Sequence, residues 1–325
     1  MAHEVEMIDG VAQMAYAGDK PWHGLGAAVS NDLTPAQMQS KAGLDWQVYK
    51  TPLYADVGGV RVNVSKQALV RNSDDKILDV IGDDWNPVQN SEAFEFFNEY
   101  VMAGDMDMEC AGSLKGGKNV FALAKIKESF SILGDDQVDS YLLFSNPHEY
   151  GKAIDIRFTP IRVVCNNTLT MSLNGKSDRG VKVGHRTSFN ADDVKTQLGI
   201  ASEKFTQYKE MAQLLGSKRF SVDNLIQYYN EILPSTSRKE ATPAPVSSYD
   251  DLSRGAKMCF DALETQPGAE YGAGTWWQAF NSVTYFTDHQ QGRNAENRLH
   301  SQWFGGNQLR KVKAAEKAVE YAVAS

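Results

Sequence analysis

Apolar and polar residues alternate along much of the first half of the chain, a pattern typical of strands that bury one face. The clearest case is IDIRFTPIRVVC at 154–165, where the alternation runs until a proline interrupts it. Such a proline indicates an edge strand or a bulge, and a bulge would bring the two arginines of this segment to one face. Similar patterns predict strands at 46–54, 60–70, 76–82, 106–114, 119–126, 138–145 and 153–165.

Apolar residues recur at helical spacing in the second half of the chain. Earlier helices are predicted from Thr34 and Pro35 to Gly43, and at 93–102, where aromatic residues are frequent. After about residue 190 the strand-like patterns end, and helices are predicted from about 190 to 215 and at 221–232, 249–263, 275–287 and 308–323. The sequence therefore predicts an α+β fold, in which antiparallel strands with a packed helix precede a helical C-terminal region.

The same patterns predict how the chain is organised into domains. Its 325 residues suffice for one large domain with an appendage, or for two domains. The segment 234–248, PSTSRKEATPAPVSS, lacks periodicity and predicts a linker. The predicted parts are an α+β core domain 1–190, a helical extension 191–233, the linker 234–248 and a C-terminal helical region 249–325.

The chain is acidic overall, with a net charge of −8, but the charge is unevenly spread. Residues 1–111 carry 7 basic and 18 acidic side chains, whereas residues 112–190 carry 11 basic and 7 acidic ones. The net charge argues against a protein that binds nucleic acid over its whole surface. A basic middle beside an acidic N-terminal third is typical of a polarised binding surface, although blocks of this size also arise by chance.

Basic side chains in this middle region are candidates for phosphate contacts. They lie in the strand 154–165, in the predicted hairpin turn KGGK at 115–118, and in the polar loop NGKSDRGVKVGHR at 174–186. Guanidinium and ammonium groups in such segments suit the backbone of a nucleic acid. The alternatives are an arginine paired with Asp155 and an ordinary solvated loop. The candidates are Lys115, Lys118, Arg157, Arg162, Lys176, Arg179, Lys182 and Arg186.

Single-stranded nucleic acid also requires exposed aromatic rings on which bases can stack. Four aromatic residues interleave with the basic strands, and most of them are expected in the core: Phe121, Tyr141, Phe144 and Phe158. The sequence therefore predicts the charged part of such an interface better than its stacking part.

The motifs of common enzyme classes are incomplete in this sequence. GSLKGGKN at 112–119 nearly matches a phosphate-binding loop, but it ends on Asn119 instead of a hydroxyl residue and precedes a predicted strand instead of a helix. The histidines lie far apart, and no cysteine has metal-ligand spacing. We therefore expect no cofactor, no metal and no catalytic residues. Acidic pairs at 83–84 and 135–136 leave a metal-dependent nuclease open as an alternative.

Composition also bears on the compartment and on the partners. Cys110, Cys165 and Cys259 are few and far apart, which is typical of reduced cysteines in a cytosolic protein. No apolar run approaches the ~20 residues that span a bilayer, and the acidic N-terminus lacks the apolar stretch of a signal peptide. We expect a cytoplasmic protein with no membrane partner.

Several short segments, taken in order, resemble one family. They are WHGLG at 22–26, AGLDW at 42–46, PVQN at 87–90 leading into EAFEF at 92–96, AGSL at 111–114 with two glycines at 116–117, and FTPIRVVCN at 158–166 with TL at 168–169. This set resembles the phage/plasmid-like protein family, long labelled a domain of unknown function and carried by bacteriophages and mobile elements. The resemblance covers about residues 10–215 and is weaker in the C-terminal helices.

The resemblance implies a fold and, by analogy, a function. The family's core, a curved antiparallel sheet with a helix across it, is similar to that of the ring-forming single-strand annealing proteins of phage recombination. The chain is then expected to bind and anneal single-stranded DNA without catalysis, as a homo-oligomer and possibly a ring, in the bacterial host cytoplasm. A different class remains open, an interaction protein that blocks a host factor through its acidic N-terminal face.

Overall fold

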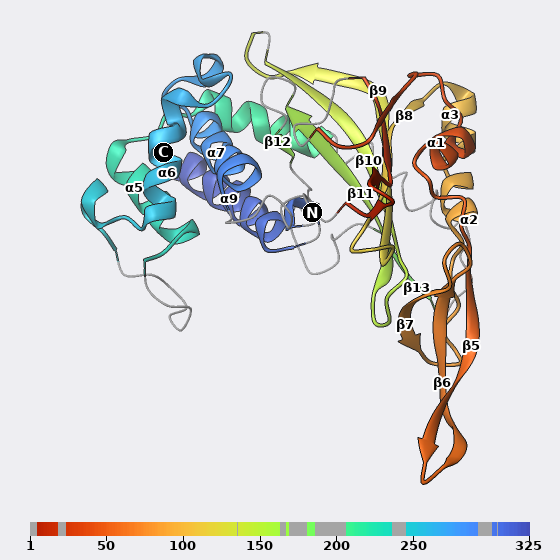
Figure 1. The fold of residues 1–325 in the computed structure, drawn as a ribbon. Coiled ribbons are helices and arrows are strands. Elements are labelled where there is room, and N and C mark those ends of the chain that lie inside the picture. The colour runs from red at the N-terminus through yellow and green to blue at the C-terminus, as the bar shows by residue number, and fades with distance from the viewer. Residues whose placement is uncertain are drawn as a thin grey trace. The chain divides into compact units, whose positions relative to one another are not determined.

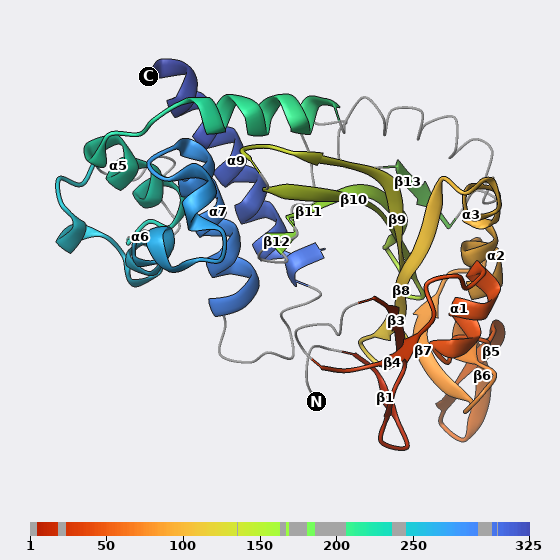
Figure 2. The ribbon, with the colours of Figure 1, turned by 90° about the horizontal axis from the view of Figure 1, so that it is seen from above.

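The computed structural model of the chain is shown in Figures 1 and 2. It describes residues 5–18, 24–134, 136–162, 167–168, 181–185, 206–235, 245–291, 301–303 and 305–325. The chain forms two compact units, and the division falls within three strands. Unit 1 comprises Met1–Lys127, Tyr141–Arg157 and Arg179–Ile200, and unit 2 comprises Glu128–Ser140, Phe158–Asp178 and Ala201–Ser325.

The largest sheet has the strand order β12-β11-β10-β9-β8-β3-β4, and β13 pairs with β11 off this path. Its strands are β3 (Met14–Ala17), β4 (Ala27–Val29), β8 (Met106–Leu114), β9 (Asn119–Ser131), β10 (Gln137–Pro147), β11 (Ala153–Arg162), β12 (Asn167–Thr168) and β13 (Val181–Gly184). Pairing is antiparallel between β8 and both β3 and β9, and parallel between β3 and β4. The curved antiparallel sheet and the helical C-terminal region confirm the predicted α+β fold.

Pro160 lies inside β11, as the sequence indicated, at a position where the strand has a partner on one side. β13 pairs with residues 153–156 of β11, and β12 pairs with residues 161–162. Pro160 lies between these two ladders, and no described strand is in register with it on that side. Proline therefore occurs where no N–H is needed for a ladder hydrogen bond.

Three short helices cover one face of the sheet in unit 1: α1 (Pro35–Lys41), α2 (Asn90–Glu95) and α3 (Asn98–Ala103). Thr34 and Gln37 form a reciprocal capping box at the start of α1. The core under these helices combines large aromatic side chains of the helices with small ones of the strands, such as Ala111, Ala122 and Ala124. The small strand residues allow the helices to lie close to the sheet.

The single helix predicted at 93–102 is instead two helices, α2 and α3, separated by Phe96 and Phe97. Both rings are fully buried.

A second sheet in unit 1 has the order β5-β6-β7, with β5 (Val48–Val57), β6 (Val60–Arg71) and β7 (Lys76–Ile81). β7 ends opposite Gln67, so the part of the β5–β6 hairpin beyond that residue is a two-stranded ribbon. We call residues 52–66 the β-arm; its ribbon projects from the end of the sheet in Figure 1. A small hairpin, β1 (Met7–Ile8) with β2 (Val11–Ala12), completes the strands of unit 1 that the structure describes.

Unit 2 holds the C-terminal helices. Residues 206–217 are helical, followed by α5 (Val222–Ile232), η2 (Tyr249–Asp251), α6 (Arg254–Thr265), η3 (Ala269–Gly272), α7 (Trp276–Tyr285), the π-turn η4 (Phe286–Gln290) and α9 (Gly306–Ala324). Trp276 is fully buried and stacks on Tyr321, with ring centroids 5.2 Å apart. The predicted helices at 221–232 and 308–323 are thus confirmed, and the one at 275–287 is α7 continued by the π-turn.

Some sequence-based expectations fall outside the described residues. The predicted boundary at 190 lies there, as does most of the predicted linker 234–248, and both stay predictions. Within the described ranges, Cys110 and Cys259 are buried free thiols, and burial raises the pKa of both. In the same ranges, no helix combines the length and the apolar character that crossing a membrane would take.

Candidate nucleic-acid interface

The turn between β8 and β9, which carries Lys115 and Lys118, is fixed against the second sheet of unit 1. The Lys76 ammonium donates a hydrogen bond of 2.7 Å to the carbonyl of Gly116. Gly117 has a positive φ of 94°, and a Cβ at this position would lie 2.7 Å from Nη1 of Arg71. Gly117 therefore allows the turn to pack closely on Arg71, and Gly116 allows it to approach Lys76. The two glycines that resemble those of a phosphate-binding loop thus have a packing role.

Arg71 is 1% exposed, and its charge is fully engaged inside unit 1. Its Nε and Nη2 donate to Asp74 at 2.8 and 2.7 Å, and its Nη1 lies 2.9 Å from both carboxylate oxygens of Glu6. The hydrogen bonds with Asp74 and Glu6 raise the pKa of Arg71, and the guanidinium lowers the pKa of Asp74. Arg71 thus supports the turn and leaves binding to the residues around it.

Lys115 and Lys118 are half-buried in this turn, and Lys76 contacts the turn at Gly116. The carbonyl of Lys118 accepts a hydrogen bond of 2.9 Å from the backbone N–H of His148. Two residues further on, the N–H of Tyr150 donates to Asp79 of β7 at 2.7 Å. The turn, the segment that follows β10 and the edge of the second sheet therefore form one connected surface.

Two exposed tyrosines on or beside this sheet are each paired with a cation. The Arg61 guanidinium lies 4.0 Å from the ring centroid of Tyr54, and the Lys66 ammonium lies 5.6 Å from that of Tyr150. Tyr54 is 46% exposed and Tyr150 is 43% exposed. A solvent-facing ring beside a cation can stack a base and neutralise the adjoining phosphate.

The four aromatic residues that the sequence placed among the basic strands are all buried, as was expected for most of them: Phe121, Tyr141, Phe144 and Phe158. Sequence reasoning missed Tyr54 and Tyr150. For Tyr54 the signal was present, because Tyr54, Asp56 and Arg61 alternate with apolar residues and so share the polar face of the β-arm. Tyr150 follows the end of β10, and its exposure has no counterpart in the pattern.

Arg157, by contrast, is held by a carboxylate two residues away. Its Nε donates to Oδ1 of Asp155 at 2.6 Å, and its Nη2 donates to Oδ2 of the same side chain. The side chains are 10% and 9% exposed. This bidentate pair is the alternative that the sequence left open, and it explains Arg157 better than a phosphate contact does.

The other candidates are described in part or not at all. The backbone of Arg162 lies at the end of β11, and Lys182 of β13 is in register with Asp155. Lys176, Arg179 and Arg186 lie outside the described residues. The structure thus places Lys115 and Lys118 in one turn, and all the phosphate contacts stay predictions.

The acidic pairs that kept a nuclease open have structural partners where they are described. Asp83 accepts a hydrogen bond of 2.7 Å from Gln67, and the buried Asp136 accepts one of 2.8 Å from the indole of Trp277. Asp135 lies outside the described residues. Among those that the structure does describe, no group of three or more histidine, cysteine or acidic side chains could hold a metal ion.

The family model of Domain of unknown function (DUF932) matches residues 77–303. The chain belongs to the DUF932 family. The match begins in β7 and includes the turn with Lys115 and Lys118 as well as Tyr150, whereas the β-arm of this DUF932 protein precedes it. No curated protein and no solved structure matches the chain.

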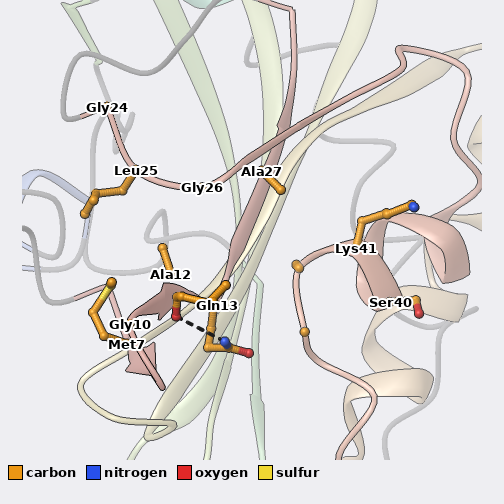
Figure 3. A pocket seen from close by; sticks show the side chains of 13 residues that line it. Met7, Gly10, Ala12, Gln13, Gly24, Leu25, Gly26, Ala27, Ser40 and Lys41 are labelled. Atoms are coloured by element: carbon orange, nitrogen blue, oxygen red, sulfur yellow. Dashed lines mark hydrogen bonds between the residues drawn. The ribbon is translucent and has the colours of Figure 1, made fainter.

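A shallow depression in unit 1 of this DUF932 protein has a volume of about 360 Å³ (Figure 3). The β1–β2 hairpin, residues 24–27 and the end of α1 line it, and Lys41 is the one charged residue among these. Gln13 turns its amide back to the carbonyl of Val11 at 3.2 Å. The depression offers few convergent polar groups, so its chemistry fits a small-molecule site poorly.

Proposed function

We propose that this DUF932 protein binds single-stranded nucleic acid, DNA first of all, and anneals complementary strands as a homo-oligomer without catalysis. Its setting would be phage-type homologous recombination in a bacterial host. The observation that carries the proposal is the pair of exposed tyrosine–cation contacts, Tyr54 with Arg61 and Tyr150 with Lys66. The curved antiparallel sheet covered by helices supports it by analogy with ring-forming annealing proteins.

The surface has the two components that a sequence-tolerant interface needs. Bases would stack on the exposed rings, each contact worth about 1–3 kcal/mol. Phosphates would contact Lys66, Lys76, Lys115 and Lys118, which the connected surface groups together. Stacking and phosphate contacts leave the edges of the bases free, as pairing with a complementary strand requires.

The predicted contacts outside the described side chains extend this proposal. They are Arg162 at the end of β11, Lys182 in β13, and Lys176, Arg179 and Arg186, which are close to β13 in the sequence. The net charge of −8 restricts binding to this region, because other surfaces would repel a polyanion.

The test is fluorescence anisotropy with a labelled single strand of about 40 nucleotides, at about 50 and about 200 mM salt. The double variant Arg61→Gln/Lys66→Gln should weaken binding roughly tenfold or more and reduce the dependence on salt. The matched control is Lys257→Gln, because Lys257 lies 5.4 Å from the ring centroid of Tyr249 in unit 2, beside acidic residues. Parent protein that fails to bind at low salt, or equal effects of both variants, would contradict the proposal.

A further inference from the structure

One face of the β5-β6-β7 sheet is mostly apolar on both sides of the register shift between Pro52 and Tyr54. Residues in register on antiparallel strands share a face, and the register groups Tyr49 with Val70 and Ile77, Ala68 with Val80, Ala55 with Val62, and Val57 with Val60. We call this surface the apolar face. Six of its side chains are between 44% and 62% exposed: Tyr49, Val57, Val60, Val62, Ile77 and Val80.

The two faces of this sheet differ sharply in charge. The register places Lys50, Asp56 and Arg61 on the opposite face, which also carries Tyr54. None of the residues that the register places on the apolar face is charged. Depletion of charged residues is the compositional signal of a protein–protein interface core, and a face without cations is unsuited to nucleic acid.

The area of this face matches the core of a stable interface. The six exposed side chains present about 500 Å² of mostly apolar surface, near the upper end for the largest patch on a monomer. A standard interface buries about 800 Å² on each partner, including a polar rim. The apolar face therefore supplies most of what one subunit of a stable dimer contributes.

The β-arm also requires a partner that is always present. Beyond Gln67 it is a two-stranded ribbon, and such a ribbon is marginally stable in water without a packed face. A cover that stabilises the arm in every molecule must be available in equal amount, and a second copy of the chain meets that condition. Two apolar sheet faces pack well at a separation of about 10 Å.

We propose that the apolar face packs against the same face of a second copy of this chain, in a two-fold symmetric pair. In such a pair each arm contacts its counterpart, and the tyrosine–cation contact at Tyr54 stays on the outer face. This pairing rests on the proposed function, in which the protein acts as a homo-oligomer, and it identifies the apolar face as the surface through which the subunits associate.

The experiment is sedimentation velocity of the full chain without nucleic acid, over a range of protein concentrations. The parent should form a dimer or a larger even-numbered species, and Val62→Asp should raise the dissociation constant at least about 100-fold by burying a charge in the interface. Val222→Asp is the matched control, because Val222 is 59% exposed in unit 2, and it should leave the assembly unchanged. Val62→Thr keeps the β-branched shape that suits a strand and should weaken the pair by a smaller factor, which separates weakened pairing from a failure to fold.

Each outcome of this experiment either supports the pairing or overturns it. A monomeric parent, or an oligomer that neither Val62 variant weakens, would overturn the pairing. The anisotropy assay with a short single strand, run on the same Val62→Asp protein, tests the proposed function separately, since the tyrosine–cation pairs are intact in that variant. A parent protein that binds the strand but stays monomeric would leave single-strand binding standing and refute this interface. A parent protein that pairs but does not bind the strand would do the reverse.

Discussion

Acidification should destabilise unit 1 through two buried histidines, His148 and His185, because burial lowers the pKa of both, and the effect of His148 can be worked out. The amide nitrogen of Asn90 donates to the carbonyls of Leu44 and Trp46, so its oxygen faces His148 and accepts from Nε2, 3.0 Å away. The Nδ1 atom of His148 has no hydrogen-bond partner among the described groups. The neutral tautomer with its proton on Nε2 fits this site, and a second proton would place a charge in apolar surroundings.

The size of the effect follows from the pKa. Burial, together with His185 and Arg71, lowers the pKa of His148 from 6.5 to about 3. Because the unfolded chain binds the proton more readily, stability is fully present above about pH 6.5 and is lost as the pH falls toward 3. Between about pH 7 and about pH 5 the loss from this group is about 2 kcal/mol.

The assay is urea unfolding at both pH values, with hydrogen exchange of peptides around β10 to confine the result to unit 1. His148→Gln keeps a donor for Asn90 and removes the titration of His148, so this part of the difference between the two pH values should vanish while the part due to His185 stays. His289→Gln is the control, because its half-buried ring lies in unit 2. A pH dependence equal in the parent and in His148→Gln would refute the reasoning.

Two further predictions concern packing. Gly117→Ala should destabilise unit 1 by about 2 kcal/mol or more, because the new Cβ displaces Arg71 and also strains a backbone with positive φ. Gly58→Ala is the control: its φ is +61° but its surroundings are open, so it should cost about 1 kcal/mol. Equal shifts in melting temperature for the two variants would contradict this. Lys311→Met should destabilise unit 2 by about 3–5 kcal/mol, because it removes the ammonium that lies 2.8 Å from the carboxylate of Asp288, which is only 2% exposed. A loss below about 1 kcal/mol in denaturant unfolding would show that Asp288 finds another partner.

The strands were the part of the fold most accessible from sequence. β8 spans the predicted 106–114, because its neighbours bury it and its turn is marked by two glycines. The predicted end of β5 was too early, since residues 55–57 pair with β6 although no core covers them. Local pattern reports which residues prefer a sheet, whereas the length of an arm depends on pairing between distant residues.

The candidate site was predictable where it rests on neighbouring residues. The turn with Lys115 and Lys118 was expected from its glycines, and the pair of Arg157 with Asp155 was open as an alternative because the two lie two residues apart on one strand. The docking of the turn on Arg71 joins residues more than 40 positions apart. The tyrosine–cation contact at Tyr150 likewise depends on tertiary contacts that no periodicity encodes.

The most direct test of the central claim is the rate at which two complementary labelled strands anneal, followed by quenching of one label by the other. The account predicts that the parent protein speeds annealing at low salt, that Arg61→Gln/Lys66→Gln loses most of this acceleration, and that Lys257→Gln retains it. A parent protein that leaves the rate at its protein-free value would contradict the account.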